Sequence, residues 1–371
     1  KLGILCTMIN GFGRRGYYNS QEIGLGRALA RKGHEVMIYK GIDPSEKEEK
    51  VQVEKNLTIW YLPMKHLGAH GFMDCKYLDP QLKALFCFGD QQIFLPHVYR
   101  WGTRRRIPFV AYVGTAHSLD SNFKSKVMNA LFAAGTLRIY KKNPVLAKTS
   151  AAKEELRQLG VPHAVIAPVG LDTAVLKKNI PADEKMRLRK EHGFEADDVI
   201  LCNVSRLSWE KRPLELIDLF LQVKGKKKFK LIIVGNGPLE EELNEKIRKN
   251  GLEKEVKIYP NVPYEKMWEI YEMSDYYLNM NKGEIFGMAI MEAVYYKTSV
   301  AAIRALGPSV TLKDMKGHKL CENDDEMAEW ITGPYPSEKD LQESSEKMAA
   351  TFTWDRCADA FLQASSEKSS R

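Results

Sequence analysis

The sequence predicts an α/β protein of two domains, each a parallel sheet with helices on both faces. Strand-sized apolar runs alternate with helix-length amphipathic segments along the chain, which is typical of such sheets. A chain of 371 residues is too long for one average core, and its apolar fraction of 44% is enough for two. Pro168 and Gly170, with no long Gly/Ser tract nearby, predict a short hinge near residues 168–182.

The first domain is expected to begin with a strand over residues 2–8, a glycine-rich turn and a helix from about residue 20 to 31. Asn19 or Ser20 can cap that helix, because a short side-chain oxygen accepts from the free amides of a first turn. Further strands are expected at residues 36–39, 57–62, 84–88, 109–113, 145–148 and 165–168.

The second domain is expected to alternate strands and helices from residue 199 onward. Its strands are expected at residues 199–204, 230–234, 256–259 and 276–279, and its helices at 213–223, 239–249 and 264–273. Residues 365–371 are small or charged, so we expect them to be frayed.

The net positive charge lies in the first half of the chain. Residues 1–170 hold 25 Lys and Arg against 13 Asp and Glu, a net +12, whereas the remainder holds 31 against 35, a net −4. The basic residues cluster, among apolar ones, at Arg104, Arg105, Arg106, Lys124, Lys126, Arg138, Lys141, Lys142 and Lys148. Such a surface attracts a phosphorylated or lipid-headgroup partner, and a merely solvated face is the alternative. No recognition motif for nucleic acid accompanies the charge.

Several classes of protein are disfavoured by composition. The apolar runs are strand-sized, far from the ~20 residues of a membrane-spanning helix, and no leader-like segment opens the chain. The six cysteines are widely spaced without a C-x-x-C pair, which is typical of reduced core residues and gives no metal site. We therefore expect a cytoplasmic protein.

Gly11, Gly13 and Gly16 spell G-x-G-x-x-G between a strand and a helix, the dinucleotide fingerprint. A nicotinamide enzyme also needs an acidic residue at the end of the next strand, where this chain has Lys40 and Gly41. An NAD(P)-dependent oxidoreductase is therefore an alternative with an incomplete fingerprint.

Two cations follow the strand at 199–204, at the edge where open α/β sheets bind ligands. Arg206 offers a planar fork for phosphate oxygens and Lys211 a movable charge, so together they suit a diphosphate. A pair of exposed loop cations is the alternative. After the next strand, Gly235-Asn236-Gly237-Pro238 forms a tight turn that allows close backbone approach.

The most specific segment follows the strand at 276–279. If a helix begins near Gly287, its free amides face an anion, Glu284 lies in the loop before it and Glu292 about two turns along. Carboxylates suit sugar and ribose hydroxyls, because each accepts paired O–H bonds. The segment therefore predicts two carboxylates beside one phosphate site.

These residues resemble family 4 glycosyltransferases of the GT-B fold. The resemblance spans nearly the whole chain and rests on five motifs in order. They are the interdomain P-x-G-x-D at Pro168, Gly170 and Asp172, the cations Arg206 and Lys211, the VGxGP turn at 234–238, E-x-F-G-x-x-x-x-E at Glu284, Phe286, Gly287 and Glu292, and Phe352-Thr353-Trp354-Asp355, where a final helix crosses back.

The resemblance implies a GT-B fold, two Rossmann-like domains that face each other across a cleft. Residues 1–170, with a helix at about 355–371, would bind the acceptor, and residues 171–354 the nucleotide sugar. It implies retaining transfer from a nucleotide sugar, with a UDP-sugar favoured over a GDP-sugar. We expect front-face substitution that needs no metal and no other cofactor, because the chain has no Asp-x-Asp and no obvious nucleophilic carboxylate.

The resemblance also implies roles for single residues. Arg206 and Lys211 would bind the diphosphate with the amides around Phe286, Gly287 and Met288, while Glu284 would hold the sugar and Glu292 the ribose. The base would lie near Asn261 and Val262, with Ser205 and Gly235 in the adjoining loops. The loop of Gly11, Gly13 and Gly16 would close over the donor. His117 would lie beside the reacting sugar. An ordinary loop histidine is the alternative for His117.

The chain departs from the family pattern after Glu292. Residues 296–300 lack the usual G-x-P-V turn, and a glycine pair is reduced to Gly307, which leaves the local loop shape and the choice of donor sugar open. The acceptor is expected to offer a hydroxyl on a lipid-linked or phosphorylated molecule, in glycan, cell-surface polysaccharide or glycolipid synthesis. The basic first domain would contact the inner face of the membrane. A sugar-nucleotide epimerase, a glycoside hydrolase and a non-catalytic binding protein remain alternatives.

Overall fold

The structure, a computed structural model, describes residues 1–9, 20–116 and 123–369, and the chain forms two compact units. The first unit comprises Lys1–Asp172 and Thr353–Arg371, and the second comprises Thr173–Phe352. The chain thus passes between units after residues 172 and 352, two residues from the divisions expected after 170 and 354.

The first unit is built on an eight-stranded sheet in the order β10-β9-β8-β7-β1-β2-β4-β3, and only β3 runs antiparallel to its neighbour. Its strands are β1 (Leu2–Cys6), β2 (Val36–Ile42), β3 (Glu49–Glu54), β4 (Leu57–Pro63), β7 (Ala84–Phe88), β8 (Phe109–Val113), β9 (Val145–Ala147) and β10 (Val165–Ile166). Every residue of β1 and of β8 is buried, because helices cover both faces of the sheet.

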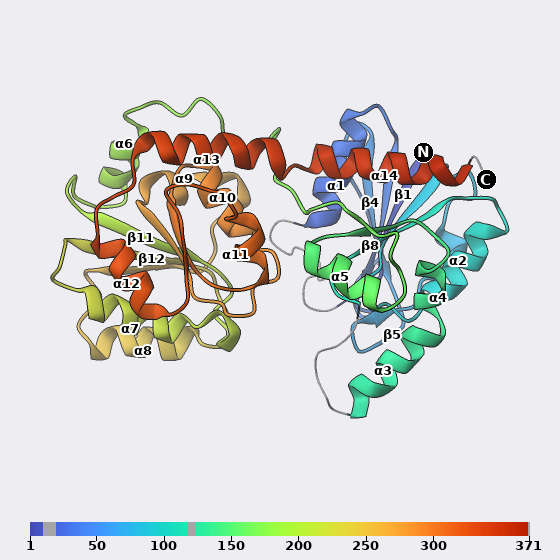
Figure 1. Ribbon diagram of the computed structural model, residues 1–371, viewed down its shortest axis with the longest axis horizontal. Helices are drawn as coiled ribbons and strands as arrows, with labels where there is room; N and C mark the ends of the chain where they lie inside the picture. Colours follow the sequence, from blue (N-terminus) through green and yellow to red (C-terminus); the bar gives the residue numbers. More distant parts are fainter. Residues whose placement is uncertain (10–19, 117–122, 370–371) are drawn as a thin grey trace. The chain divides into compact units, whose positions relative to one another are not determined.

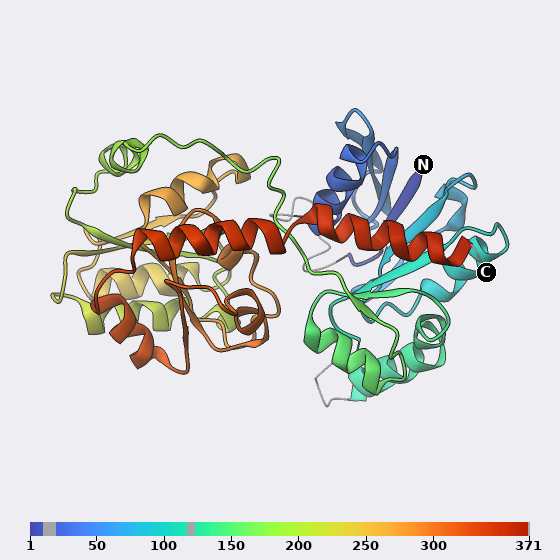
Figure 2. The ribbon, with the colours of Figure 1, turned by 45° about the horizontal axis from the view of Figure 1, so that its top comes forward.

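Helices cover this sheet on both sides, as Figures 1 and 2 show. They are α1 (Gln21–Arg31), α2 (Leu95–Thr103), α3 (Phe123–Ala134), α4 (Thr136–Tyr140), α5 (Ser150–Gln158) and α14 (Trp354–Ser369). The hairpin of β5 (His66–Leu67) and β6 (His70–Gly71) and the 3-10 turn η2 (Cys75–Tyr77) complete the unit. α1 follows Ser20 as expected, although the Ser20 side chain accepts no capping hydrogen bond.

The P-x-G-x-D motif anchors the final helix to the first unit. A Cβ atom on Gly170 would lie 2.1 Å from the backbone of Thr353, so only glycine allows the two segments to approach. Asp172 is buried and accepts from Arg31 of α1 at 3.0 Å, and Arg31 also pairs with Asp355 of α14 at 3.1 Å. The motif therefore has a structural reason within this unit.

The second unit contains a six-stranded, wholly parallel sheet in the order β13-β12-β11-β14-β15-β16. Its strands are β11 (Val199–Val204), β12 (Phe229–Val234), β13 (Val256–Tyr259), β14 (Tyr276–Asn279), β15 (Ser299–Ile303) and β16 (Lys319–Cys321). The order reverses between β11 and β14, which places a topological switch point, the usual ligand site of such sheets, at their carboxyl ends.

The helices of the second unit form two layers around this sheet (Figure 1). On one face lie α7 (Pro213–Val223), α8 (Glu240–Lys249) and α12 (Asp324–Thr332). On the other lie α6 (Glu184–Glu191), α9 (Met267–Met273), α10 (Met288–Tyr295) and α13 (Glu338–Thr351). Short elements are η3 (Trp209–Lys211), η4 (Tyr264–Lys266) and α11 (Leu306–Thr311).

The turn after α10 keeps a compact form despite its unusual sequence. Lys297 has a φ of 61°, the left-handed conformation that favours glycine, and its amide donates to Val294 O. Ser299 is buried, and its hydroxyl donates to Gly317 O at 2.8 Å and lies 3.3 Å from the indole nitrogen of Trp330. Lys297 thus takes the left-handed position at the end of α10, and Ser299 is held by hydrogen bonds.

Replacing Lys297 by glycine is expected to stabilise the protein. Glycine removes the cost of a side chain at positive φ, and after the greater flexibility of the unfolded chain is subtracted we expect a gain of about 0.5–1 kcal/mol. Denaturant unfolding measures it. Lys190→Gly, inside α6, is the control and should cost about 1 kcal/mol. If both variants are destabilised alike, Lys297 carries no backbone strain.

His318 is expected to make the second unit sensitive to acid. Its Nδ1 accepts from Val300 N at 3.0 Å, and burial lowers the pKa of this imidazole from 6.5 to about 4. The neutral ring is favoured in the fold, so the stability is fully present above pH 6.5 and is lost as pH falls from 6.5 through 4. The loss should reach about 3 kcal/mol.

Unfolding measured against pH in His318→Asn tests this expectation, because asparagine can accept the same hydrogen bond without titrating. The difference in stability between wild type and variant should change over that pH window. A difference that is constant with pH would show that His318 does not titrate with folding.

No helix among the described residues is long and apolar enough to cross a membrane.

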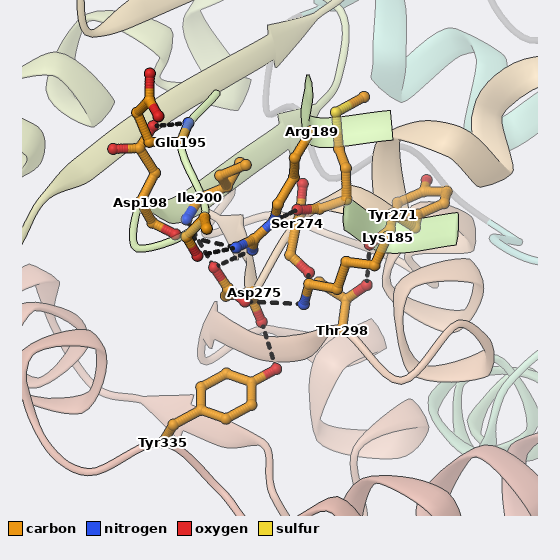
Figure 3. A network of polar contacts seen from close by, with 12 residues as sticks. Lys185, Arg189, Glu195, Asp198, Ile200, Tyr271, Ser274, Asp275, Thr298 and Tyr335 are labelled. Carbon is orange, nitrogen blue, oxygen red and sulfur yellow. Dashed lines mark hydrogen bonds and ion pairs between the residues drawn. The ribbon is translucent and has the colours of Figure 1, made fainter. Parts of the chain in front are cut away.

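A polar network holds the amino edge of the second sheet (Figure 3). Asp275 lies at its centre and accepts from Arg189 at 2.6 Å, Lys185 at 2.9 Å and the amide of Ile200 at 2.8 Å. Arg189 also donates to the carbonyls of Met273 and Asp198, and Tyr335 donates to Asp275 O. A cavity of about 250 Å³ lies beside this network. Because it opens where β11 and β14 begin, it lies at the edge opposite the switch point.

Candidate functional site

The loop after β11 carries the two predicted phosphate ligands. It runs from Ser205 through Arg206 into η3, which ends at Lys211. The side chain of Arg206 is exposed and makes no ion pair or hydrogen bond with another described residue, although its charge contributes to lowering the pKa of Glu210. Its guanidinium therefore keeps its donors available. Lys211 is only 24% exposed and points to a carboxylate.

The turn of Gly235 to Pro238 packs against the loop that carries Arg206. Gly235 has a φ of 142°, and a Cβ atom there would lie 1.9 Å from Ser205 O. A Cβ atom on Gly237 would lie 2.4 Å from Leu207 O, while the Leu207 amide donates to Asn236 O. The two glycines are needed because the backbone of one loop packs directly on that of the other. The turn therefore positions Arg206 and need not touch a ligand itself.

Glu284 is placed by side chains at the end of β14. Asn279 accepts from the amide of Asn281, and Asn281 accepts from the amide of Gly283. Asn281 then donates to Glu284 Oε2 at 3.1 Å, and Lys211 Nζ donates to the same oxygen at 2.8 Å. Lys211 and Glu284, 73 residues apart in sequence, thus form a pair at the switch point.

Contacts with Lys211 and Asn281 keep the carboxyl group of Glu284 ionised. Burial alone would raise the pKa of the carboxyl group, but the charge of Lys211 and the hydrogen bonds from Lys211 and Asn281 outweigh it and lower the pKa. Glu284 is therefore a carboxylate that accepts hydrogen bonds, and it is a poor proton donor at neutral pH. This electrostatic state suits a ligand for hydroxyl groups better than a general acid.

Helix α10 begins beside this pair. Gly287 precedes its first residue, Met288, with a φ of 82° that a side chain rarely adopts. The first amides of the helix have no partner within it, and they concentrate partial positive charge at this end. Phe286 is 7% exposed and packs edge-on against Phe352 at 6.1 Å.

The single glycine left of the expected pair supports the same loop. A Cβ atom on Gly307 would lie 2.6 Å from Phe286 N, and the Gly307 amide donates to Glu284 O at 2.8 Å. One glycine, Gly307, is therefore enough for this close approach at the position where the family usually has two. Its amide thus joins α11 to the loop of Glu284.

Glu292 lies about one turn into α10, because it is only the fifth of its eight residues. The expectation of two turns was wrong, because even from Gly287 the five residues to Glu292 make only about 1.4 turns at 3.6 residues per turn. Its side chain is 1% exposed, and Tyr271 of α9 donates to Oε2 at 2.8 Å. The Tyr271 ring stacks on Tyr296, whose hydroxyl accepts from the amide of Lys177. The side chain of Glu292 is therefore fixed by its hydrogen bond from Tyr271.

Asn261 and Val262 lie in the loop between β13 and η4, where Asn261 is exposed and Val262 half-buried. This loop is tied to the glycine turn by Asn236, which donates to Pro260 O at 3.0 Å. The structure thus gathers the loops after β11, β12, β13 and β14, with all predicted residues of the second unit, at one sheet edge.

Three contributing residues were missed by sequence analysis. Arg212 has a φ of 55° and donates to both oxygens of Asp324, at 3.1 and 2.8 Å, which fixes the end of η3 next to Lys211. Asn279 and Asn281 form the hydrogen bonds that aim Glu284. Asparagine directly after a strand is a signal of such turns, and it could have been used.

The predicted residues of the first unit lie outside the described residues. Gly11, Gly13, Gly16 and His117 belong to segments 10–19 and 117–122, so their predictions stand untested. In the described residues after β8, Asp90 accepts from the amides of Gly114 and Thr115, and Glu155 accepts from that of Ala116.

Lys40 bears on the oxidoreductase alternative. It is 1% exposed and forms an ion pair with Glu22 of α1, so Lys40 itself offers nothing to a ribose. β2 runs past the expected end at residue 39 to Ile42, and Asp43 follows it directly, so an acidic residue does lie at the end of this strand.

Similarity to known proteins agrees with this site. Residues 184–347 match a family described as glycosyl transferases group 1. The D-inositol 3-phosphate glycosyltransferase of Xylanimonas cellulosilytica is 23% identical, over 97% of this chain and 94% of the relative. The alpha-monoglucosyldiacylglycerol synthase of Acholeplasma laidlawii is 21% identical over 73% of each chain.

Solved structures show the same fold. HepE of Anabaena, solved with UDP and glucose, aligns with a TM-score of 0.72 and 17% identity over 99% of each chain. Sucrose-phosphate synthase of Thermosynechococcus elongatus aligns with a TM-score of 0.73 and 15% identity over 100% of each chain.

Two Rossmann-like units of this kind, with this site at the switch point of the second, define a glycosyltransferase of the GT-B fold. The motifs resemble those of glycosyltransferase family 4, and the family match over residues 184–347 and the named relatives agree with that resemblance.

Proposed function

We propose that the protein transfers a sugar, with retention of anomeric configuration, from a UDP-sugar to a hydroxyl acceptor. The observation that carries the proposal is the pair of Lys211 and Glu284 beside the start of α10. One charge of each sign then lies at the point where a diphosphate would meet its sugar.

The diphosphate is bound by cations and amides. Arg206 and Lys211 contact its oxygens, and the amides around Phe286, Gly287 and Met288 add the partial positive charge of a helix start. As the sugar leaves, negative charge grows on the diphosphate, and these groups stabilise it more strongly than the ground state. Lys211 uses one of its three donors on Glu284, so two remain for phosphate oxygens.

The hydroxyl groups of the donor are held by the two carboxylates. Glu284 accepts from the transferred sugar and Glu292 from the ribose, while the base lies against Asn261 and Val262 with Ser205 and Gly235 in the adjoining loops. HepE, whose structure contains UDP and glucose, supports the preference for a UDP-sugar. The loop with Gly11, Gly13 and Gly16 closes over the donor, and His117 lies beside the reacting sugar.

The reaction is a front-face substitution without a metal. The acceptor hydroxyl attacks on the side from which the diphosphate leaves, the new C–O bond forms as the C–O bond to phosphate breaks, and the departing phosphate oxygen takes the hydroxyl proton. The chain has no Asp-x-Asp to hold a divalent cation on the diphosphate, which supports this part of the proposal. Turnover in EDTA equal to that in manganese supports the proposal, and loss in EDTA with rescue by manganese contradicts it.

The acceptor is a hydroxyl on a lipid-linked or phosphorylated molecule of glycan, cell-surface polysaccharide or glycolipid synthesis. The net +12 of residues 1–170 supports an anionic acceptor. One relative is named a D-inositol 3-phosphate glycosyltransferase and another an alpha-monoglucosyldiacylglycerol synthase, so the names mention a phosphorylated molecule and a glycolipid.

Thermal unfolding with UDP, GDP, ADP and their sugars tests the donor. A ligand at 100 times its dissociation constant adds about 2.7 kcal/mol of apparent stability. We expect UDP and UDP-sugars to raise Tm most. A larger rise with GDP would contradict the UDP preference, and no rise with any nucleotide would contradict the donor site. Product that forms without any acceptor would indicate an epimerase instead.

A further inference from the structure

Helix α3 lies at the periphery of the first unit (Figure 1). It exposes an apolar stripe. Phe123 is 83% exposed, Val127 42% and Leu131 47%. These residues are four apart, so they lie on one face of the helix. Ala130 and Ala134 are exposed on the same face. A single exposed apolar side chain is ordinary, but three large ones in line on a single helix are not.

The opposite face of α3 is already used for packing. Ser125, Met128 and Phe132 are buried against the unit, and Phe132 packs edge-on against Tyr140 of α4 at 5.8 Å. α3 is therefore apolar on both faces, although only one is covered within the unit. A helix that is apolar all round normally lies in a core or against a membrane.

Positive charge surrounds the stripe. From residue 121 to 153 the chain carries no Asp or Glu and seven Lys or Arg. Those whose side chains are exposed on α3, on the adjoining α4 and just after it are Lys126, Arg138, Lys141 and Lys142. Two such faces would repel each other, so a second copy of the chain is a poor partner. A surface of opposite charge with an apolar interior fits both features.

We infer that α3 docks this glycosyltransferase on an anionic lipid membrane. Phe123, Val127 and Leu131 enter the boundary between headgroups and acyl chains, with the helix parallel to the surface. Lys126, Arg138, Lys141 and Lys142 contact lipid phosphates, each adding attraction that salt weakens. The inference rests on the proposed function only in naming where the acceptor is met, since docking itself requires no catalysis.

Vesicle flotation of the full chain tests the inference. The probes are vesicles of mixed phosphatidylglycerol and phosphatidylcholine, and vesicles of phosphatidylcholine alone. We expect flotation with the anionic vesicles at low salt, and weaker flotation at high salt or without anionic lipid. In the variant Phe123→Ser, Val127→Ser, Leu131→Ser, bound protein should fall by about tenfold or more. The variant Lys126→Gln, Arg138→Gln, Lys141→Gln, Lys142→Gln should lose the preference for anionic lipid.

A matched control replaces exposed apolar residues elsewhere. Val175 and Met186 are 43% and 45% exposed, and the variant Val175→Ser, Met186→Ser should float as the wild type does. The rise of Tm with UDP should be equal in all variants, which shows that they are folded. If UDP fails to bind throughout, the proposed donor fails while docking is still decided by flotation.

Three results would overturn docking. They are no flotation of the wild type, equal flotation of the α3 serine variant, and a wild-type dimer in light scattering that this variant converts to monomer. The last result would make the stripe an interface between copies of the chain.

Discussion

Replacing Lys211 by alanine is expected to lower kcat by about 100- to 1,000-fold, the loss typical of removing one charge-stabilising group. The ammonium lies 2.8 Å from Glu284 Oε2, so its loss removes a phosphate ligand and also the counter-charge that lowers the pKa of Glu284. The pKa of Glu284 should then rise, since burial is no longer opposed by Lys211. Steady-state kinetics with a UDP-sugar, measured against pH, report both effects.

The control is Lys282→Ala, since Lys282 is exposed on the same edge and makes no ion pair with a described residue. Its kcat should stay near the wild-type value. Arg206→Ala should resemble Lys211→Ala in kcat but leave the pH profile unchanged, because Arg206 does not pair with Glu284. Equal activity of the Lys211 variant and the wild type would remove Lys211 from the phosphate site.

Replacing Asp275 by alanine is expected to cost about 3–5 kcal/mol of unfolding free energy, the range for breaking one partner of a buried ion pair. Arg189 would remain 6% exposed in its side chain, without the carboxylate that it contacts at 2.6 Å. Lys185 and the amide of Ile200 would lose a partner as well. Denaturant unfolding measures the loss.

A surface pair serves as the control for this prediction. Asp197 pairs with Lys228, both more than half exposed, so Asp197→Ala should leave stability unchanged. Because the Asp275 network lies at the amino edge of the sheet, the folded Asp275 variant should bind UDP as the wild type does. A stability equal to that of the wild type, or a loss of UDP affinity in folded protein, would contradict this view of the network.

The fold was largely predictable because parallel strands buried on both faces give continuous apolar runs. β11, β12, β13 and β14 lie at or within one residue of the expected ranges. β3, β15 and β16 were missed. The charged residues of β3 are exposed on an antiparallel edge strand and give no apolar run. β15 is fully buried, but it is only five residues long with two alanines, and β16 has only three residues. The helix α3 was also missed. Its apolar residues lie on both faces, so the sequence shows no amphipathic helical period.

The site was predictable where a motif combined spacing with residue type. Lys211, Glu284 and Glu292 were assigned from their motifs, and the structure brings the first two to 2.8 Å. Contacts that depend on tertiary packing were not accessible from sequence. The approach of Gly307 to Phe286 and the pairing of Lys40 with Glu22 join residues whose spacing follows no local rule.

Titration of UDP into Glu292→Gln tests the central claim, that the carboxyl edge of the second unit holds the nucleotide sugar. Glutamine keeps the shape of the side chain near Tyr271 but removes the charge that accepts from ribose hydroxyls. Calorimetry should show UDP affinity weaker by about 10- to 100-fold, whereas Glu329→Gln, an exposed residue of α12, should bind as the wild type does. Unchanged UDP affinity in folded Glu292→Gln protein would contradict the account and leave Glu292 a structural residue that joins α10 to α9.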